Sequence, residues 1–236
     1  MSTIPKGLET SIEGEPSASV AAPRRVSTIW RPVCEFTRQV LKALGIALGM
    51  VVAALPVMMV WIESSLSDRG ELFLFWGQCF SLVPGLPGKY VRKCYYRLTL
   101  RSFSLSADIG FLSFFTHREA EVGQRVYVGS GASIGIATLG DGALIGTRVS
   151  IISGGQQHQM GSDGRLTACL PESLQRVSIG AETWIGEAAV IMADVGSHCI
   201  VAAGSLVSSP VRAGCLVGGN PARFVRKLIE NPADCP

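Results

Sequence analysis

Apolar and polar residues are arranged in two different ways along this chain, first as one long apolar run and later as a short repeat. The run ALGIALGMVVAALPVMMVWI extends from Ala43 to Ile62 without a charge. At a rise of about 1.5 Å per residue, a helix of this length spans the roughly 30 Å hydrocarbon core of a bilayer. A buried helix of a soluble domain is the alternative, but such a helix seldom lacks polar residues on every face. The run therefore predicts a membrane helix.

A second apolar stretch, LFLFWGQCFSLVPGLPG, lies between Leu72 and Gly88. It is short for a membrane crossing, and two prolines end it. Basic residues flank the pair of stretches on both sides, whereas the charges between the stretches are mostly acidic. Positive charge prefers the cytoplasmic side of a membrane. Residues 39–104 are therefore predicted to form a membrane hairpin or re-entrant pair with an interfacial segment, and both ends are expected in the cytoplasm.

The rest of the chain carries a repeat of period six, in which an aliphatic residue is usually followed by glycine. The aliphatic positions include Val122, Val128, Ile134, Leu139, Ile145, Ile151, Ile179, Ile185 and Ile191. Short strands at this period are typical of a solenoid built from hexapeptides, with three strands per coil. An antiparallel β-sandwich is the alternative, but its loops vary in length, whereas this period holds through consecutive units. The pattern predicts an all-β solenoid over residues 105–220.

Three places depart from the period. The unit IGIAT is one residue short, and IMAD is followed directly by VGSHCI, two residues short; both are expected to be tight corners. Between Gln157 and Val177 an insert, QHQMGSDGRLTACLPESLQR, interrupts the solenoid. Insertions in solenoids form loops on one face, and this is often the functional face.

Composition narrows the possible functions. The chain has 236 residues, 47% of them hydrophobic and 17% charged, which excludes a wholly disordered protein. A net charge of +3 is too small to indicate a nucleic-acid partner. Seven cysteines without a CxxC pair indicate reduced thiols in a cytosol-facing protein. The Ser-, Pro-, Glu- and Ala-rich start of the chain predicts a disordered tail over residues 1–38.

From about Ala107 to Arg226 the chain resembles the hexapeptide-repeat acyltransferases, on the runs TWIGEAAVIMADVG, VAAGSLV and GGNPARFVRK. The segment LVPGLPGKYVRKCYYRLTL resembles membrane-associated members of polysaccharide biosynthesis. The resemblance implies a left-handed parallel β-helix, a homotrimer with active sites between neighbouring prisms, and acetyl-CoA as the acyl donor. The segment 221–236 is expected to form a short C-terminal helix and tail.

His158 is the predicted catalytic base, because it opens the insert in the run SGGQQH. Acyl transfer to a hydroxyl requires a base, and neutral imidazole suits this role near pH 7; the resemblance implies a histidine in such a loop. A surface histidine that only bonds its neighbours is the alternative. His117 and His198 are lesser candidates, and the wide spacing of the three histidines argues against a zinc site.

Coenzyme A requires a groove where its pantetheine arm meets exposed backbone. The candidate residues for this groove are Gly186, Ala188, Ala203, Gly204 and Ser205, although tight solenoid corners require the same small residues. Trp184 resembles a tryptophan that the family often has beside the coenzyme. Arg223 and Arg226 are predicted to meet the nucleotide phosphates, with a solvated helix face or lipid contact as the alternative.

The sequence thus predicts a membrane-anchored O-acetyltransferase that moves an acetyl group from acetyl-CoA to a sugar hydroxyl, with no metal. A saccharide acceptor, lipid-linked or free, and the lipid bilayer are the expected partners, and nucleic acid is not. Because acetyl-CoA is cytosolic, the solenoid is expected on the cytoplasmic side of the inner membrane. A small-molecule or amino-sugar N-acetyltransferase of the same fold and a non-catalytic membrane scaffold are the alternatives.

Overall fold

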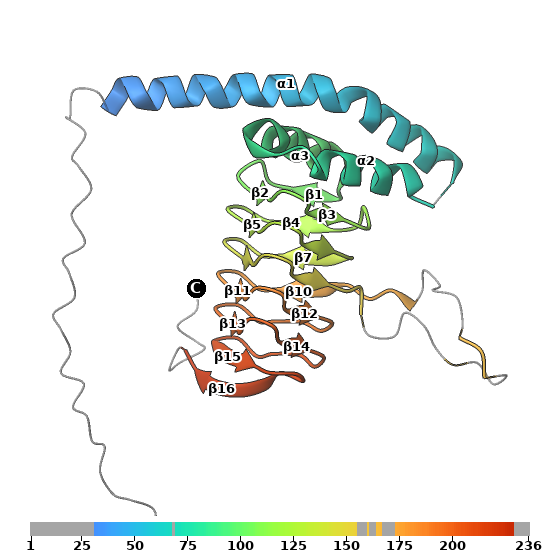
Figure 1. The fold of residues 1–236 in the computed structure, drawn as a ribbon, viewed down its shortest axis with the longest axis vertical. Helices are drawn as coiled ribbons and strands as arrows, with labels where there is room; N and C mark the ends of the chain where they lie inside the picture. The colour runs from blue at the N-terminus through green and yellow to red at the C-terminus, as the bar shows by residue number, and fades with distance from the viewer. Residues whose placement is uncertain (1–30, 68, 155–159, 161–163, 167–172, 229–236) are drawn as a thin grey trace, which may run out of the picture. The chain divides into compact units, whose positions relative to one another are not determined.

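Three helices precede the solenoid in this computed structural model, which describes residues 31–67, 69–154, 160, 164–166 and 173–228. They are α1 (Arg31–Leu66), α2 (Glu71–Ser81) and α3 (Gly85–Thr99) (Figure 1). By length and composition, α1 is the one helix of the described chain that could cross a membrane, with a mean hydropathy of 2.4 in its apolar part. It begins at Arg31, inside the segment that the sequence predicted as tail. At 11 residues, α2 is too short to be a second span.

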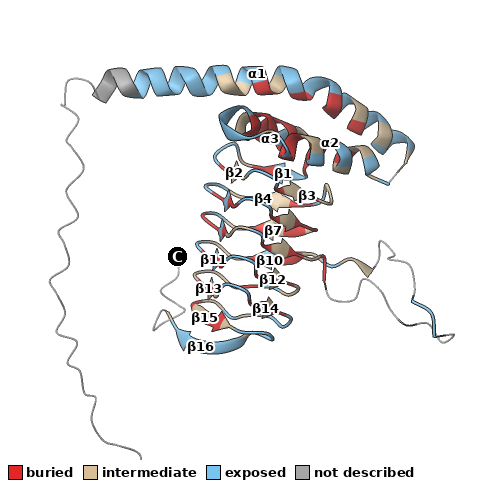
Figure 2. Cartoon of the chain, in the orientation of Figure 1, coloured by how far each residue is buried: buried red, intermediate tan, exposed pale blue. Residues whose placement is uncertain are grey.

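Small residues let the second half of α1 lie directly on α3. A Cβ added to Gly49 would be 2.9 Å from the Cys94 sulfur, and one added to Gly45 would meet the Tyr90 ring. The next turns of α1 bury Ala53, Val57 and Val60. The opposite face of α1 is exposed and apolar (Figure 2). The helix therefore has one packed stripe and one stripe without a partner in the described chain.

The solenoid has three parallel sheets, which we call faces A, B and C. Face A consists of β1 (Ser102–Phe103), β4 (Glu121–Val122), β7 (Ala137–Leu139) and β10 (Val177–Ile179), continued by single bridges at Val195 and Val211. Face B consists of β2 (Asp108–Ile109), β5 (Tyr127–Val128), β8 (Leu144–Ile145), β11 (Trp184–Ile185), β13 (Ile200–Val201) and β15 (Cys215–Gly218). Face C consists of β3 (Phe114–Phe115), β6 (Ser133–Ile134), β9 (Ser150–Ile151), β12 (Val190–Ile191) and β14 (Leu206–Val207).

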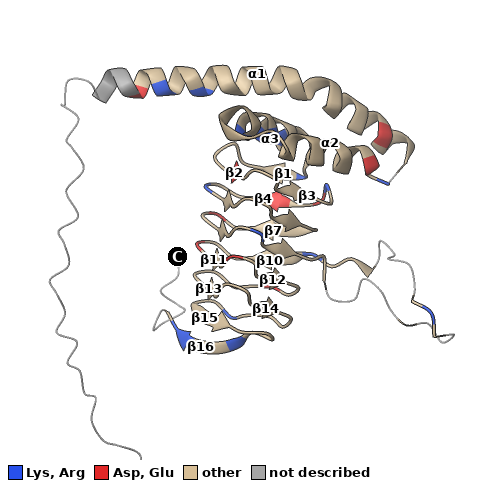
Figure 3. Ribbon diagram, in the orientation of Figure 1, with Lys and Arg blue, Asp and Glu red and all other residues tan. Residues whose placement is uncertain are grey.

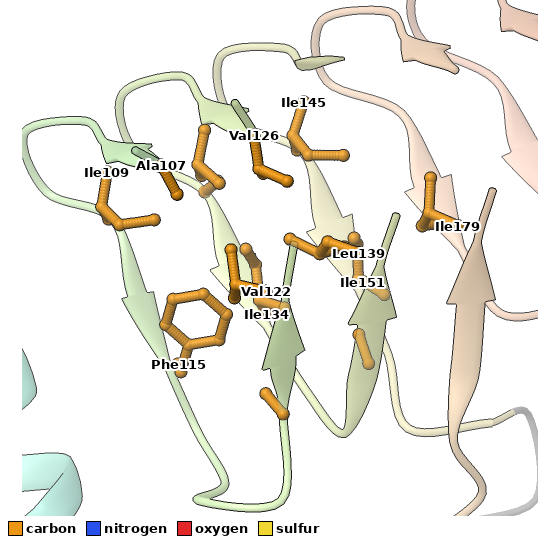
Figure 4. Close-up of a cluster of buried hydrophobic side chains, with 14 of the residues drawn as sticks. Ala107, Ile109, Phe115, Val122, Val126, Ile134, Leu139, Ile145, Ile151 and Ile179 are labelled. Carbon is orange, nitrogen blue, oxygen red and sulfur yellow. The ribbon is translucent and has the colours of Figure 1, made fainter. Parts of the chain in front are cut away.

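The core is three columns of side chains, one from each face. The two-residue strands each point one residue inward, and the three-residue strands β7 and β10 each bury two. Ile145 of face B, Ile151 of face C and Leu139 of face A meet within one coil (Figure 4). Parallel pairing places the same position of the next coil directly on each of them, as Ile185 lies on Ile145. These inward residues are nearly all fully buried. The predicted parallel solenoid is confirmed.

The corners between the faces are not alike. Six residues separate successive inward positions at every A–B corner, for example Leu139 to Ile145, and at every B–C corner, for example Ile185 to Ile191. The C–A corners span seven, five, 28, four and four residues along the solenoid. Both shortened repeats and the insert therefore fall at the C–A corner.

Buried charge joins the helices to the first coil. The Arg92 guanidinium donates to the carbonyls of Ile109 (3.1 Å), Phe80 (3.0 Å) and Val83 (2.7 Å). The Asp108 carboxylate binds Lys89 at 2.6 Å and Lys93 at 2.5 Å. Burial alone would raise the pKa of Asp108, but the hydrogen bonds and charges of the two lysines outweigh it and hold that pKa below its usual value.

The predicted C-terminal helix is wrong over its described part. Residues 223–227 form β16 (Arg223–Lys227), which runs antiparallel to β15 after a turn at Gly219, where φ is 102°. β15 is the last parallel strand of face B, and an antiparallel strand satisfies its free backbone groups. The apolar spacing of Phe224, Val225 and Leu228 suggested a helix, but sheet pairing outweighs that local pattern.

Candidate functional site

Five of the predicted coenzyme residues lie at the B–C corner, stacked in two successive coils. Gly186 donates its N–H to the Val201 carbonyl at 2.8 Å, and Gly204 donates to Glu187 at 2.8 Å. A Cβ at Gly186 would lie 2.5 Å from the backbone nitrogen of Ala203, so close contact between coils requires glycine here. Ala188 (φ 56°) and Gly204 (φ 68°) both turn the chain in the left-handed region, and Ala188, Ala203 and Gly204 are exposed. The corner thus exposes a narrow strip of small residues.

Ser205 differs from the other four. Its side chain is buried, and its Oγ accepts a hydrogen bond from the Gly219 N–H at 3.2 Å. The hydroxyl therefore joins two coils inside the solenoid. A ligand at the corner would meet the backbone of this residue and not its side chain.

Trp184 lies on the outer surface of face B and is 51% exposed. The ladder places it between Leu144 and Ile200, with Tyr127 one coil further along. Tyr127, Leu144 and Trp184 together form an exposed apolar stripe on face B. Arg223 and Arg226 are exposed on β16, at the end of the same face (Figure 3). The two arginines therefore lie three strand positions beyond Trp184, after β13 and β15.

His158 lies outside the described residues, as do its immediate neighbours. The described ends of the insert fix where the loop begins and ends. Ile152 follows β9 of face C, and Gln175 returns to β10 of face A with its N–H on the Ser153 carbonyl at 3.0 Å. The loop therefore leaves and rejoins the solenoid at the C–A corner. Face C separates this corner from the strip of coenzyme residues within one chain.

A cleft of about 490 Å³ lies beside the two described ends of the loop. Its walls come from three successive coils at the C–A corner: Gly154, Gln175, Arg176, Met192, Asp194 and Ser208 are among them. Arg176 donates to the Glu119 carbonyl at 2.7 Å and to the Thr138 hydroxyl at 3.1 Å, and it lies 3.6 Å from the Glu121 carboxylate. This arginine fastens the loop to two earlier coils. Sequence reasoning missed it, because its partners are far away in the sequence.

A second cleft, of about 840 Å³, lies on the C–A corner nearer the helices. Glu63 and Arg69 contribute from the end of α1 and the turn that follows, and His117, Arg118 and Glu119 contribute from the corner between β3 and β4. Burial lowers the pKa of His117, while the charge of Glu119 opposes that shift. In the sequence, only the irregular run around His117 indicated a site in this region.

His198 lies at an A–B corner and not in either cleft. Its backbone is in the left-handed region (φ 55°), and its N–H donates to the Ala181 carbonyl at 2.9 Å. The residue makes a turn that recurs at Arg125 and Glu182 in earlier coils. Across the described chain, no three His, Cys, Asp or Glu side chains are grouped in a way that could hold a metal ion.

Solved acetyltransferases have a similar fold. A maltose O-acetyltransferase from Clostridium difficile 630 has a TM-score of 0.59 and 17% identity, and the match covers 67% of this chain and 86% of that one. A hexapeptide-repeat acetyltransferase from Vibrio cholerae O1 biovar eltor, complexed with acetyl coenzyme A, has a TM-score of 0.57 and 20% identity, over 70% and 91% of the two chains. A galactoside acetyltransferase in complex with coenzyme A has a TM-score of 0.52 and 19% identity, over 77% and 84%. At these identities the likeness establishes the fold.

Sequence similarity leads to the same kind of protein. Serine acetyltransferase 2 of Arabidopsis thaliana is 30% identical over 116 residues, which is 48% of this chain and 32% of that protein. A chloramphenicol acetyltransferase of Agrobacterium fabrum is 38% identical over 55 residues, 22% of this chain and 26% of that protein. The chain thus spans about a third of these curated relatives or less. No family model matches it. The resemblance to the hexapeptide-repeat acyltransferases is confirmed, and their solenoid is the fold of this chain.

Proposed function

We propose that this protein transfers an acetyl group from acetyl-CoA to a hydroxyl group of a saccharide at a membrane surface. The observation that carries the proposal is the strip of exposed small residues at the B–C corner, on a solenoid whose solved neighbours include complexes with acetyl-CoA and with coenzyme A. Maltose O-acetyltransferase and galactoside acetyltransferase are among those neighbours, which favours a sugar as acceptor.

The pantetheine arm of the coenzyme runs along the B–C corner. Its amides pair with backbone groups beside Gly204, where the absence of a side chain leaves open space for close approach. The exposed Trp184 ring covers the arm from face B. Arg223 and Arg226, at the end of that face, bind the nucleotide phosphates through charge-assisted hydrogen bonds.

His158 removes the proton from the acceptor hydroxyl. The hydroxyl oxygen then attacks the thioester carbonyl carbon, the carbon–sulfur bond breaks, and the protonated imidazole gives its proton to the departing sulfur. The two described ends of the loop support this role, because they fix its base beside a cleft that could receive the acceptor. The one Gly-x-Ser-x-Gly run of the sequence, at residues 131–135, lies on β6 within the solenoid and not at a strand-to-helix turn, which favours direct attack over a covalent serine intermediate.

The active site lies between copies of the chain in a homotrimer. Within one chain, face C separates the loop at the C–A corner from the coenzyme strip at the B–C corner, so the two meet when neighbouring copies bring unlike corners together. The exposed stripe of Tyr127, Leu144 and Trp184 on face B is the kind of apolar surface that such packing covers.

The helices attach the enzyme to the cytoplasmic surface of the inner membrane. Leu48, Val51 and Leu55 are exposed on the free face of α1, and Leu82 and Leu86 are exposed nearby in sequence, after α2. These side chains bury in lipid at a gain of about 25 cal/mol per Å². Attachment also raises the effective concentration of an acceptor that is itself carried on a lipid.

The deciding experiment measures acetyl-CoA binding and acetyl transfer by the detergent-solubilised full chain on polyprenyl-linked saccharides. His158→Ala should retain coenzyme affinity and lose turnover, whereas Trp184→Ala should weaken coenzyme binding about tenfold. His198→Asn is the matched control, because asparagine tolerates the left-handed turn and leaves the loop unchanged. If the wild-type chain binds no acetyl-CoA, the acetyltransferase proposal is wrong and a membrane scaffold explains the fold better.

A further inference from the structure

The cleft of about 840 Å³ on the C–A corner is not used by the reaction as described so far. One wall is the last turn of α1 and the turn to α2, and the opposite wall is the corner between β3 and β4. Ile136 and Leu174 complete the lining, and Leu174 belongs to the returning end of the loop that carries His158. The cleft therefore connects the helices to the base of the loop.

His117 presents one nitrogen without a partner to this cleft. The Thr116 hydroxyl lies 2.8 Å from the Nδ1 of His117 and 3.3 Å from the Ile134 carbonyl. The carbonyl can only accept, so in the tautomer in which the hydroxyl donates to it, Nδ1 carries the N–H that the hydroxyl oxygen receives. Nε2 is then the nitrogen with the free lone pair. Within the described chain it has no hydrogen-bond partner.

The charges around His117 are balanced. Arg69 and Arg118 face the cleft as cations, and Glu63 and Glu119 face it as anions. Both oxygens of Glu63 accept the Leu72 N–H at the start of α2, at 3.1 and 3.0 Å, and Arg118 donates to the Thr99 carbonyl at 3.3 Å. A strongly charged ligand gains little from such a lining. A neutral ligand with many hydroxyl groups is better matched.

The remaining lining agrees with such a ligand. The hydroxyls of Ser64 and Ser67 add acceptors, while Ile136 and Leu174 offer apolar surface. An apolar surface with a few well-placed polar groups is typical of small-molecule sites, and it suits a sugar ring, which has both C–H and O–H groups.

The position of the cleft selects the kind of saccharide. Leu66, at the end of α1 and beside Ser67 of the cleft, is 82% exposed and continues the apolar surface of the helix. A lipid chain could lie on that surface while the sugar attached to it reaches the cleft.

We propose that this cleft binds the saccharide of a lipid-carried acceptor, next to its lipid, and that Nε2 of His117 accepts a hydrogen bond from a sugar hydroxyl. The inference rests on the proposed acetyltransferase function and adds the acceptor subsite to it. His117 is a binding residue here, and His158 remains the base. Burial keeps the imidazole neutral near pH 7, as an acceptor must be.

Binding can be tested without turnover by nuclear magnetic resonance of the histidine rings. The chain has three histidines, so few resonances have to be assigned. The full chain in nanodiscs is labelled at the histidine ring carbons, and His117→Gln assigns the resonance of interest. Polyprenyl diphosphates carrying glucose, galactose or N-acetylglucosamine are added, and polyprenyl diphosphate without sugar is the control. We expect a saccharide to shift the His117 resonance while the sugar-free carrier does not. If no saccharide shifts it, or if the bare carrier shifts it equally, the inference is wrong.

Kinetics provide the second test. His117→Ala should raise the KM for the saccharide about tenfold, equivalent to one hydrogen bond, with kcat at saturating acceptor and the KM for acetyl-CoA unchanged. His117→Gln should restore part of the loss, because its amide oxygen reaches the place of Nε2. Leu174→Trp, which fills the cleft, should raise the same KM. If His117→Ala leaves the KM for the saccharide unchanged in an active enzyme, the acceptor subsite is wrong but the acetyltransferase function stands. If the wild-type chain does not bind acetyl-CoA, the proposed function itself is wrong.

Discussion

The A–B and B–C corners of the solenoid repeat without change, whereas the C–A corner differs from coil to coil. At the first two corners six residues always separate the inward side chains, and glycines such as Gly146 and Gly186 lie against the backbone of the next coil. At the C–A corner the spacing changes along the solenoid. The three core columns stay in register all the same.

This difference shows where a solenoid can accept change. Strand pairing fixes two corners of every coil, so an altered length at the third corner is absorbed before the next strand begins. Both clefts and both ends of the long loop lie at that third corner. The variation in corner length and the candidate acceptor surface therefore lie on the same edge of the solenoid.

Insertion of a single residue should show the largest difference in stability between the regular corners and the C–A corner. One glycine added between Gly186 and Glu187, at a B–C corner, would turn the following inward residues outward and abolish cooperative unfolding. One glycine added between Ser209 and Pro210, at a C–A corner, should cost about 1 kcal/mol or less. Urea unfolding of the solubilised chain, followed by circular dichroism, measures both. Equal losses for the two insertions would mean that the corners are equally rigid.

Glycine substitutions give the next largest effect. Gly186→Ala puts a Cβ 2.5 Å from the Ala203 nitrogen and should destabilise the fold by about 3 kcal/mol. Gly204→Ala, in the next coil of the same corner, has no atom within 4 Å and should lose only about 1 kcal/mol for its positive φ. The difference in unfolding free energy measures how closely the coils stack. A smaller loss at Gly186 than at Gly204 would contradict the close contact.

At the C–A corner, where the spacing is irregular, side-chain hydrogen bonds hold neighbouring coils together. The buried Ser153 hydroxyl accepts the Ile136 N–H of the neighbouring coil at 2.8 Å. Ser153→Ala leaves that N–H without a partner and should cost about 1–2 kcal/mol in unfolding free energy. The exposed Ser208 of the same corner is the control, and Ser208→Ala should be nearly neutral. A neutral Ser153→Ala would show that water replaces the bond.

The smallest expected effect is a pH dependence that comes from His117. Because its pKa in the folded chain lies below the unfolded value of 6.5, the folded state binds fewer protons in that window. Stability should therefore fall as pH drops below about 6.5, and this loss should stop below the folded pKa. His117→Gln should remove that step from a profile of unfolding free energy against pH. If the step persists in the variant, another group is responsible.

Much of this architecture could be predicted from the sequence, because the period of six is a local signal. One aliphatic residue per strand identifies the inward columns, and Ile145 and Ile185 already lie on one face by counting alone. The C-terminal strand could not be predicted in this way. Residues 223–227 pair with β15 through backbone groups. The pattern of side chains does not indicate which strand will pair with the last strand of a sheet.

The candidate site was only partly predictable, for a related reason. Gly204 could be found because its left-handed turn depends on neighbouring residues, and Gly186 because the period of six places it directly after an inward residue. The cleft at His117 could not, since Glu63 and Arg69 reach it from the helices, more than forty residues earlier in the chain. His158 remains a prediction. The residues that sequence reasoning found are those set by local backbone geometry, and those it missed depend on packing between distant segments.

The two ends of the solenoid are closed by unlike elements, with α2 and α3 over β1, β2 and β3 and the antiparallel β16 beside β15. An open coil would be a template, since its free backbone groups accept another parallel strand from any chain nearby. Without residues after 218, β15 would offer that edge, and two molecules could pair end to end; fibrils would require loss of the helices as well. The helices and β16 act as terminators of a linear polymer whose repeating unit is one coil. Coils could be gained or lost between them while both terminators stay the same.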